Sequence, residues 1–508
     1  MTLPRTSGVL LHPTSLPGGF GIGDLGATAL TFVDTLAAAG QRLWQVLPLG
    51  PTGYGDSPYQ CFSAFAGNPL LISLDTLVQQ GLLSEPDVGN DATFSDGPVD
   101  FPRVIAHRLA LWPRVLERFD EAPAPMRDTF DAFCRAHAAW LDDFALFMAI
   151  KAAHHHLPWT MWERDIAQRD PGAIERWTRQ SEREIRQHKL TQFLFFEQWG
   201  RVRDACRARG ISIMGDLPIF VAHDSADVWA RRELFRLDAD GQPTVVAGVP
   251  PDYFSATGQL WGNPHYRWEA LAQTGYAWWV DRFRALLGVV DRVRIDHFRG
   301  FEASWEVPRG AVTAVYGEWV KAPGAALFEA VRSGLGLEGL PFVAENLGVI
   351  TPEVEGLRER FGFPGMAILQ FAFGTDPQAP DFKPHNYPRN RVVYTGTHDN
   401  DTTLGWWSGD AGHSTRSAVD ITNEREYACR YLGMDGHDVH WEFIRAVLAS
   451  VADTAIVPAQ DLLGLGSEAR MNRPGTIGGN WRWRLRPGQL TPEIAGRLGV
   501  LAQTYDRV

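Results

Sequence analysis

The chain has 508 residues, of which 45% are hydrophobic and 21% charged, which allows a large buried core and is typical of a globular protein. Its formal net charge of −12 argues against nucleic acid or an anionic membrane as the main partner, because both reward positive surface. The four cysteines are scattered with no CxxC pair, which indicates a reducing compartment and gives neither a disulfide framework nor a zinc motif. The first residues lack the apolar run of a signal peptide, and no stretch is apolar enough to span a bilayer, so we expect a cytoplasmic protein.

Short apolar segments recur along the chain, and several of them end in polar or charged residues. The eight segments span residues 9–11, 43–47, 211–216, 293–296, 342–345, 368–371, 392–394 and 455–458. Each is short enough to be a buried parallel strand. Helical patterns lie between many of them, at residues 27–39, 191–209, 325–333 and 441–451. This alternation predicts an α/β fold, a (β/α)8 barrel whose chemistry lies at the C-terminal ends of the strands.

The predicted strands are unevenly spaced. About 160 residues separate the second from the third, far more than a connecting loop needs. We therefore expect a mainly helical insertion at about residues 56–190, where apolar side chains share one helix face: Phe130, Phe133, Trp140, Phe144, Phe147 and Met148. A second insertion at about residues 220–280, rich in Gly, Pro, Tyr and Trp, is predicted to be an ordered loop region over the barrel mouth. In this interpretation residues 1–508 form a single elaborated catalytic barrel.

Acidic residues mark the ends of several predicted strands. Arg294 and Asp296 lie on one face of the fourth strand, because side chains alternate with a period of two. A guanidinium beside a carboxylate should lower the pKa of Asp296 and keep it anionic, as a nucleophile requires. Glu345 ends the fifth strand with no adjacent cation, which suits an acid that keeps its proton. Asp216 ends the third strand, and Asp399 follows the seventh.

These acids point to glycoside chemistry, which needs one ionised carboxylate and one protonated carboxyl group. Any one of them alone would also suit a turn or a helix cap. Asp296, Glu345 and Asp399 lie on strands of the same predicted barrel, so a shared site at its mouth is favoured over three separate turns.

Three of these segments resemble the signature blocks of a known family. VRIDHFRG at residues 293–300, AENLG at 344–348 and GTHDNDT at 396–402 are similar to those of the amylomaltases. These are bacterial 4-α-glucanotransferases, related to the plant disproportionating enzyme and part of the wider α-amylase clan. The resemblance runs nearly end to end and includes LHPTSLPG at 11–18, WQVLPLGPTGYGDSPY at 44–59, GDLPIFV at 215–221, PPDYFS at 250–255 and SEARMN at 467–472.

The resemblance implies a role for each matching residue. It makes Asp296 the nucleophile, Glu345 the general acid/base and Asp399 the residue that grips and distorts the reacting sugar. The substrate-binding residues that it implies are Arg294, His398 and Asp216 as supporting groups, Tyr59 as a stacking ring with Ser57 nearby, Tyr253 and Trp261 on the acceptor side, Asn472 on the chain, and Tyr54 as a remote glucan-binding ring. We predict no metal and no cofactor.

Two positions depart from the family pattern. Asn346 stands where the family commonly has Asp, which should change the hydrogen bonding near the acid but not the acid itself. Phe101 lies near the position where a relative has a tyrosine that partners the remote ring, so we leave that accessory glucan site open.

Other motifs favour structural roles. GIGDLG at residues 21–26 matches GxGxxG, but it is separated from the preceding strand and lacks a ribose-binding acid, so we expect a barrel loop. The three histidines at 154–156 would point roughly 100° apart on a helix, which favours a helix end over a metal site. The HDND run at 398–401 has no supporting histidine cluster, and we predict no metal there. RWRLR at 482–486 is expected to be a packed turn or helix.

The combined hypothesis is a transglycosylase that cuts an α-1,4 bond in a malto-oligosaccharide, starch or glycogen chain. It would pass the non-reducing portion to the 4-OH of another glucan with retained configuration, which predicts carboxyl groups ~5–5.5 Å apart. Cyclic products are left open, and we expect a monomer whose partners are glucan donors and acceptors. Two alternatives remain: an α-amylase-type hydrolase with the same acids, and a glucan-binding protein on an inactive barrel.

Overall fold

The structure, a computed structural model, describes residues 5–89, 94–251, 257–409 and 416–508. Its centre is a closed barrel of eight parallel strands in the order β1-β12-β11-β10-β9-β6-β3-β2. The strands are β1 (Thr6–Leu10), β2 (Leu43–Gln45), β3 (Ser212–Pro218), β6 (Arg292–Asp296), β9 (Phe342–Ala344), β10 (Gly365–Ile368), β11 (Arg391–Tyr394) and β12 (Thr454–Pro458). The predicted (β/α)8 barrel is therefore confirmed.

The barrel strands are buried on both faces, because helices cover the outside and side chains fill the interior. All five residues of β1 and of β12 are buried, and these two strands pair in register from Thr6 opposite Thr454. This burial explains why the strands read as short apolar runs rather than as alternating patterns.

One strand prediction is wrong in position. The sixth strand was expected at residues 368–371, but β10 is Gly365–Ile368 and Leu369–Ala372 form a 3-10 helix. The strand begins at a glycine, because a Cβ on residue 365 would lie 2.7 Å from the Asn346 side-chain oxygen. A glycine selected by such a close approach does not look like the start of a strand in the sequence.

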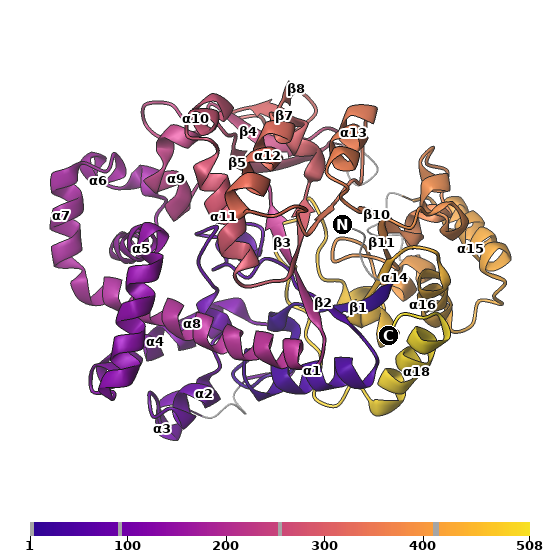
Figure 1. The fold of residues 1–508 in the computed structure, drawn as a ribbon, viewed down its shortest axis with the longest axis horizontal. Coiled ribbons are helices and arrows are strands. Elements are labelled where there is room, and N and C mark those ends of the chain that lie inside the picture. The colour runs from indigo at the N-terminus through magenta and orange to yellow at the C-terminus, as the bar shows by residue number, and fades with distance from the viewer. Residues whose placement is uncertain (1–4, 90–93, 252–256, 410–415) are drawn as a thin grey trace.

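Helices surround the barrel (Figure 1). Those that follow barrel strands or pack near them are α1 (Ala27–Ala38), α8 (Glu182–Ala208), α11 (Ala277–Leu287), α12 (Gly324–Leu335), α13 (Pro352–Arg360), α14 (Thr403–Ser408), α15 (Ala418–Leu432), α16 (Val439–Ala449), α17 (Ala459–Leu462) and α18 (Pro492–Thr504). Four of these overlap the helices expected from the sequence, although α8 begins at Glu182 rather than at residue 191. None of the helices in the described ranges is long and apolar enough to cross a membrane.

The long segment between β2 and β3 is helical and extends to one side of the barrel, at the left in Figure 1. Before α8 it contains α2 (Leu74–Gln79), α3 (Glu85–Val88), α4 (Phe101–Asp120), α5 (Ala124–Ala153), α6 (Arg164–Ala167) and α7 (Pro171–Gln180). Aromatic rings hold it together: Phe130 of α5 lies edge-on to Phe119 of α4 at 5.2 Å and to Phe193 of α8 at 5.8 Å. His154 directly follows the last residue of α5, so the three histidines lie at a helix end, as predicted.

The segment between β3 and β6 is more regular than the predicted loop region. It contains α9 (Ala226–Ala230), β4 (Val245–Val249), β5 (Gln259–Pro264) and α10 (Trp268–Gln273). Strands β4 and β5 join β7 (Ala303–Pro308) and β8 (Glu318–Lys321), which follow β6, in a sheet of order β5-β4-β7-β8. This antiparallel sheet, at the top of Figure 1, was not predicted, because β4 and β7 pair across more than fifty residues of sequence.

Short 3-10 turns complete the connections. Those away from the site are η1 (Pro13–Ser15), η3 (Pro69–Leu71), η5 (Trp159–Met161), η6 (Arg232–Leu234), η9 (Ala379–Phe382), η10 (Pro384–Asn386) and η12 (Ser467–Ala469). Two more, η2 (Tyr54–Asp56) and η7 (Phe298–Phe301), lie next to the site described below.

Candidate active site

A cleft of about 630 Å³ lies over the C-terminal ends of the barrel strands. Most of the residues expected from the sequence line it, namely Tyr54, Ser57, Tyr59, Trp261, Arg294, Asp296, Glu345, His398, Asp399 and Asn472. Asp216 is 3% exposed and lies beneath them. Tyr253 lies outside the described residues, so its placement stays a prediction.

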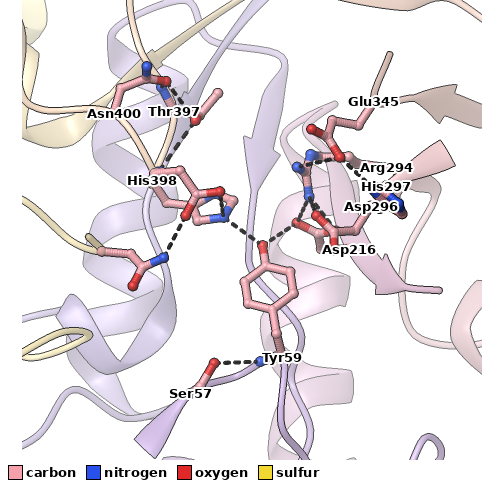
Figure 2. Close-up of polar contacts among 12 residues, drawn as sticks. Ser57, Tyr59, Asp216, Arg294, Asp296, His297, Glu345, Thr397, His398 and Asn400 are labelled. Atoms are coloured by element: carbon pink, nitrogen blue, oxygen red, sulfur yellow. Dashed lines mark hydrogen bonds and ion pairs between the residues drawn. The ribbon is translucent and has the colours of Figure 1, made fainter. Parts of the chain in front are cut away.

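Arg294 gathers the carboxylates of three barrel strands (Figure 2). Its Nη1 lies 2.7 and 2.8 Å from the two Asp216 oxygens and 3.0 Å from Asp296 Oδ1. Its Nη2 lies 3.6 Å from Glu345 Oε2. Strands β3 and β6 pair in register with Asp216 opposite Arg294, which explains why this ion pair forms. The nucleophile and the acid proposed from the sequence therefore face the same guanidinium.

Glu345 directly follows β9 and is held by a backbone donor. Its Oε2 accepts a hydrogen bond from the N–H of His297, the residue after Asp296. His297 adopts a left-handed backbone conformation, with φ 50° and ψ 49°, which a non-glycine residue rarely adopts and which turns this N–H toward Glu345. The contact fixes Glu345 relative to the end of β6.

Burial raises the pKa of Glu345 to about 7, against the lowering effects of Arg294 and of the His297 N–H. Burial also raises the pKa of Asp296, and the charges of Glu345, Asp216 and Asp399 add to this rise. Arg294 lowers the pKa of Asp296, as predicted, but burial outweighs it. The expectation of a lowered pKa for Asp296 is therefore wrong, because the sequence did not show how deeply the carboxylates are enclosed.

Both carboxyl groups contact Arg294, and the charge of Glu345 raises the pKa of Asp296, so the two groups compete for a proton. We assign that proton to Glu345, because Arg294 approaches Asp296 to 3.0 Å but Glu345 only to 3.6 Å. With Glu345 neutral, its repulsion of Asp296 disappears and Asp296 remains an anion paired with Arg294. This division leaves one protonated and one ionised carboxyl group, the combination that a retaining glycosidase-type site requires.

Tyr59 connects Asp216 to the opposite side of the cleft (Figure 2). Its hydroxyl donates to Asp216 Oδ2 at 2.8 Å and lies 2.9 Å from His398 Nε2. Because the single hydroxyl proton goes to Asp216, His398 donates to the tyrosine oxygen from Nε2. Burial lowers the pKa of His398, so the ring is neutral at neutral pH. Ser57 supports the turn by accepting a hydrogen bond from the Tyr59 N–H at 3.2 Å.

Asp399 lies on the His398 side, in the loop after β11. Its Oδ1 accepts a hydrogen bond from Asn472 Nδ2 at 2.6 Å, and its Oδ2 is 3.4 Å from His398 Nε2. Its side chain is 35% exposed, against 24% for Asp296 and 19% for Glu345. It is thus the carboxylate of this set that is most open to a ligand.

The residues assigned to the glucan chain are more dispersed. Trp261 of β5 meets the His297 ring edge-on at 4.8 Å, close to Glu345. Tyr54 is 71% exposed at the rim of the cleft. Phe101 is 2% exposed in the core at the start of α4, so it presents no ring at the surface.

Asn346 makes two specific contacts. Its amide donates to Glu355 Oε1 at 2.6 Å, and its oxygen accepts from the Met366 N–H at 2.8 Å. An amide supplies both a donor and an acceptor, whereas an aspartate would present a second carboxylate to Glu355. The departure from the family pattern therefore matches its surroundings in this chain.

Sequence reasoning did not single out Trp481, an aromatic residue of the site. Trp481 lines the cleft and lies 5.7 Å from the ring of Tyr59 and 6.0 Å from that of His398. The available signal was the Gly-Gly-Asn run that precedes it, which is typical of a turn. The neighbouring RWRLR segment is packed, since Arg482 and Arg484 donate to backbone carbonyls at 2.7 Å.

The described residues contain no group of three or more His, Cys, Asp or Glu side chains arranged to hold a metal ion. The HDND run instead forms internal contacts, with Asn400 Oδ1 accepting from the N–H of Thr397 at 3.0 Å.

Comparisons with known proteins identify the family of the chain. The sequence profile of the Glyco_hydro_77 family, described as 4-alpha-glucanotransferase, matches residues 11–491. The chain is 51% identical to the 4-alpha-glucanotransferase of Thermus thermophilus, with 100% of both chains covered. It is also 51% identical to that of Synechocystis sp., covering 99% of this chain and 98% of the relative. An amylomaltase from Streptococcus agalactiae, solved in complex with acarbose, matches with a TM-score of 0.92 and 38% identity over 99% of each chain. The chain therefore belongs to glycoside hydrolase family 77 and is an enzyme of the 4-α-glucanotransferase (amylomaltase) class.

Proposed function

We propose that this 4-α-glucanotransferase acts by double displacement, with Asp296 as the nucleophile and Glu345 as the general acid/base. The observation that carries the proposal is the contact of both carboxyl groups with Arg294 at the barrel mouth, at 3.0 and 3.6 Å. Its substrates are α-1,4-glucans, both as donor and as acceptor.

In the first step Asp296 attacks the anomeric carbon of the donor while Glu345 protonates the glycosidic oxygen. The bond between that carbon and oxygen breaks, and the reducing-side portion leaves with a new hydroxyl group. The donor portion stays attached to Asp296 as a glycosyl ester. In the second step Glu345 removes the proton from the 4-OH of an acceptor, whose oxygen displaces Asp296. Two inversions retain the α configuration.

Asp399 and His398 are proposed to bind the sugar that undergoes attack. The exposed Asp399 carboxylate offers acceptor oxygens for sugar hydroxyls, and its bond to Asn472 holds it in place. The hydroxyl of Tyr59 is bound to Asp216, which fixes the tyrosine ring, and we propose that this ring contacts the same sugar. Contacts that tighten as the ring flattens would stabilise the oxocarbenium-like transition state.

Transfer rather than hydrolysis requires that an acceptor sugar outcompete water at the glycosyl ester. Trp261, beside His297 and Glu345, supports the proposal that an aromatic wall shields this side and orients the acceptor. Tyr253 is proposed to belong to the same wall.

The product pattern from maltotriose tests this proposal. The wild-type enzyme should form both longer oligosaccharides and glucose while the number of reducing ends stays nearly constant, because each bond broken is replaced by one formed. Glu345→Gln should lose this activity, by about 10²- to 10⁴-fold, as expected for removal of a general acid. A steady rise in reducing ends would indicate a hydrolase, and absence of products from the wild type would indicate a glucan-binding protein.

We further propose that the enzyme works in the cytoplasm as a monomer. All four cysteines are free, which suits a reducing compartment. The exposed large apolar side chains include several at the cleft, where a glucan would cover them: Tyr54, Leu260, Val312, Trp319, Val349 and Ile477. Sedimentation at micromolar concentration would test the oligomeric state.

A further inference from the structure

One wall of the cleft is formed by the connection between β7 and β8, which neither the sequence motifs nor the proposed chemistry uses. Val312 and Trp319, 93% and 37% exposed, line the cleft from this connection and from β8. Tyr316, between them and 81% exposed, is not among the cleft-lining residues in the described part of the chain. Exposed apolar side chains gathered at a cleft indicate a surface that is covered when a ligand binds.

Trp319 is held rigidly before any ligand arrives. The guanidinium of Arg299, a residue that is 5% exposed, lies 3.5 Å from the centre of the Trp319 ring. Arg299 in turn donates from Nη1 to the carbonyl of Val349. The Trp319 ring also lies 5.2 Å from the ring of Trp305, with the two planes tilted by 58°. An indole clamped in this way loses little conformational entropy on binding, so its exposed surface is a preorganised platform.

The contact with Arg299 places Trp319 on the same side of the cleft as Glu345. Arg299 follows His297 by two residues, and the His297 N–H binds Glu345. Val349, which Arg299 contacts, follows Glu345 by four residues. His398 lies on the opposite side of the site from Glu345 and His297 (Figure 2). The general acid protonates the leaving group, so the side of Glu345 and Trp319 is the side of the leaving group and the acceptor.

We propose that Trp319 forms an acceptor-side subsite that binds a glucose unit beyond the first acceptor ring of an α-1,4-glucan. A glucose ring presents an apolar C–H face to an aromatic surface and hydroxyls to water, which suits a partly exposed indole at the edge of a cleft. The charge of Arg299 is engaged by the Val349 carbonyl and the indole, so the platform suits a neutral ligand. This inference rests on the proposed function, because it takes Glu345 as the acid that defines the acceptor side.

The test measures how the enzyme discriminates acceptors by length. With α-maltotriosyl fluoride as donor, fluoride is the leaving group and no donor glucose occupies the acceptor side, so the KM of the acceptor reports that side alone. Trp319→Ala should raise the KM for maltotriose as acceptor about tenfold, the loss expected for one stacked ring, while the KM for glucose stays within about twofold of wild type. Trp319→Phe should restore most of the affinity for maltotriose.

Tyr316→Ala is the matched control, since it removes an exposed aromatic side chain from the same connection outside the cleft. It should leave the KM of every acceptor unchanged. An equal rise in KM for glucose and maltotriose in Trp319→Ala, or no rise for either, would overturn the proposal. Thermal unfolding of each variant shows whether it is folded.

A second measurement separates this inference from the proposed function. Calorimetric binding of maltoheptaose to Glu345→Gln requires no turnover, and adding Trp319→Ala should weaken it about tenfold. If wild type releases fluoride but forms no longer glucans, the transfer mechanism fails, and this binding comparison still decides on Trp319. Equal affinity in the presence and absence of Trp319 would rule out the platform.

Discussion

Arg294 is the residue on which the charge balance of the cleft depends. It is 2% exposed, and it contacts Asp216, Asp296 and Glu345. One cation among three carboxylates leaves excess negative charge in an enclosed space, which a proton on Glu345 reduces. The arrangement thus favours the protonation state that the first catalytic step needs.

The pH dependence of activity should report this proton. The pKa of Glu345 is raised to about 7, and the proton is present below that value, so kcat/KM for maltotriose should fall as the pH rises through about 7. The measurement is kcat/KM between pH 5 and pH 9. A profile that stays flat to pH 9 would contradict the assignment of Glu345 as the acid.

The free energy of unfolding should also depend on pH through Glu345. Because the pKa of Glu345 is higher in the folded chain than in the unfolded one, its contribution is present at low pH and is lost as the pH rises through about 7. Glu345→Gln cannot ionise and does not lose this contribution. The unfolding free energy of the variant minus that of wild type should therefore increase from pH 5 to pH 8. Urea unfolding at both values checks this, and a difference that shrinks toward pH 8 would oppose it.

Removal of the Arg294 charge should destabilise the fold in a pH-dependent way. Arg294→Met leaves Asp216, Asp296 and Glu345 without their cation and should cost about 3–5 kcal/mol of unfolding free energy at pH 8. The cost should shrink toward pH 5, because the raised pKa values let carboxylates take up protons. Adding Asp216→Asn should recover part of the loss at pH 8, and a loss that is equal at both pH values would contradict the electrostatic explanation.

At the scale of elements, the join between β9, β10 and α13 fixes the position of Glu345. Asn346 bonds to Met366 of β10 and to Glu355 of α13, and Gly365 leaves space for its amide. Glu355 is also bound by Arg358, at 2.7 Å. The residue beside the acid is therefore anchored to two neighbouring elements, which supports the position of Glu345 at the end of its strand.

Asn346→Asp should disrupt this join between β9, β10 and α13. The new carboxylate would face Glu355 at hydrogen-bond distance, with an expected cost of about 1–3 kcal/mol and a lower kcat. Adding Glu355→Gln supplies a donor again and should restore much of the kcat. Unfolding and kcat of both single variants and the double variant give the coupling, and purely additive effects would contradict the proposed contact.

At the scale of the whole molecule, a single buried arginine joins distant parts of the barrel. Arg507, which is 0% exposed, donates to the carbonyl oxygens of Thr6 at 3.0 Å, Leu448 at 2.6 Å and Ala452 at 2.9 Å. These atoms belong to β1, to α16 and to the loop before β12. Arg507 therefore links β1 to the segments that precede β12, and its charge is balanced by several carbonyl acceptors.

Arg507→Met should remove these donors and leave the carbonyls of Leu448 and Ala452 with the longer 3.4 Å bonds from Arg5. It should lower the unfolding free energy by about 3 kcal/mol, with kcat at 25 °C unchanged because the residue is far from the cleft. Arg497→Ala, which removes a half-exposed arginine paired with Asp438 on the nearby surface, should change stability by less than about 1 kcal/mol. Thermal or urea unfolding distinguishes the two, and equal effects would show that burial at position 507 is not decisive.

The sequence by itself determined the barrel and its main acids. The strands are local apolar runs, and Asp296, Glu345 and Asp399 follow them at short range, so both are readable without tertiary information. Periodicity also predicted the helical region that contains α5. The family blocks then assigned this chain to its family before any contact was known.

Only the tertiary structure decided how those acids share charge. Whether the pKa of Asp296 rises or falls depends on whether its burial outweighs the charge of Arg294, and that burial comes from residues far apart in the sequence. The same holds for the sheet that pairs β4 with β7, and for the position of Trp319 at the cleft. Desolvation and long-range strand pairing are properties of the assembled chain, and a pattern of neighbouring residues does not encode them.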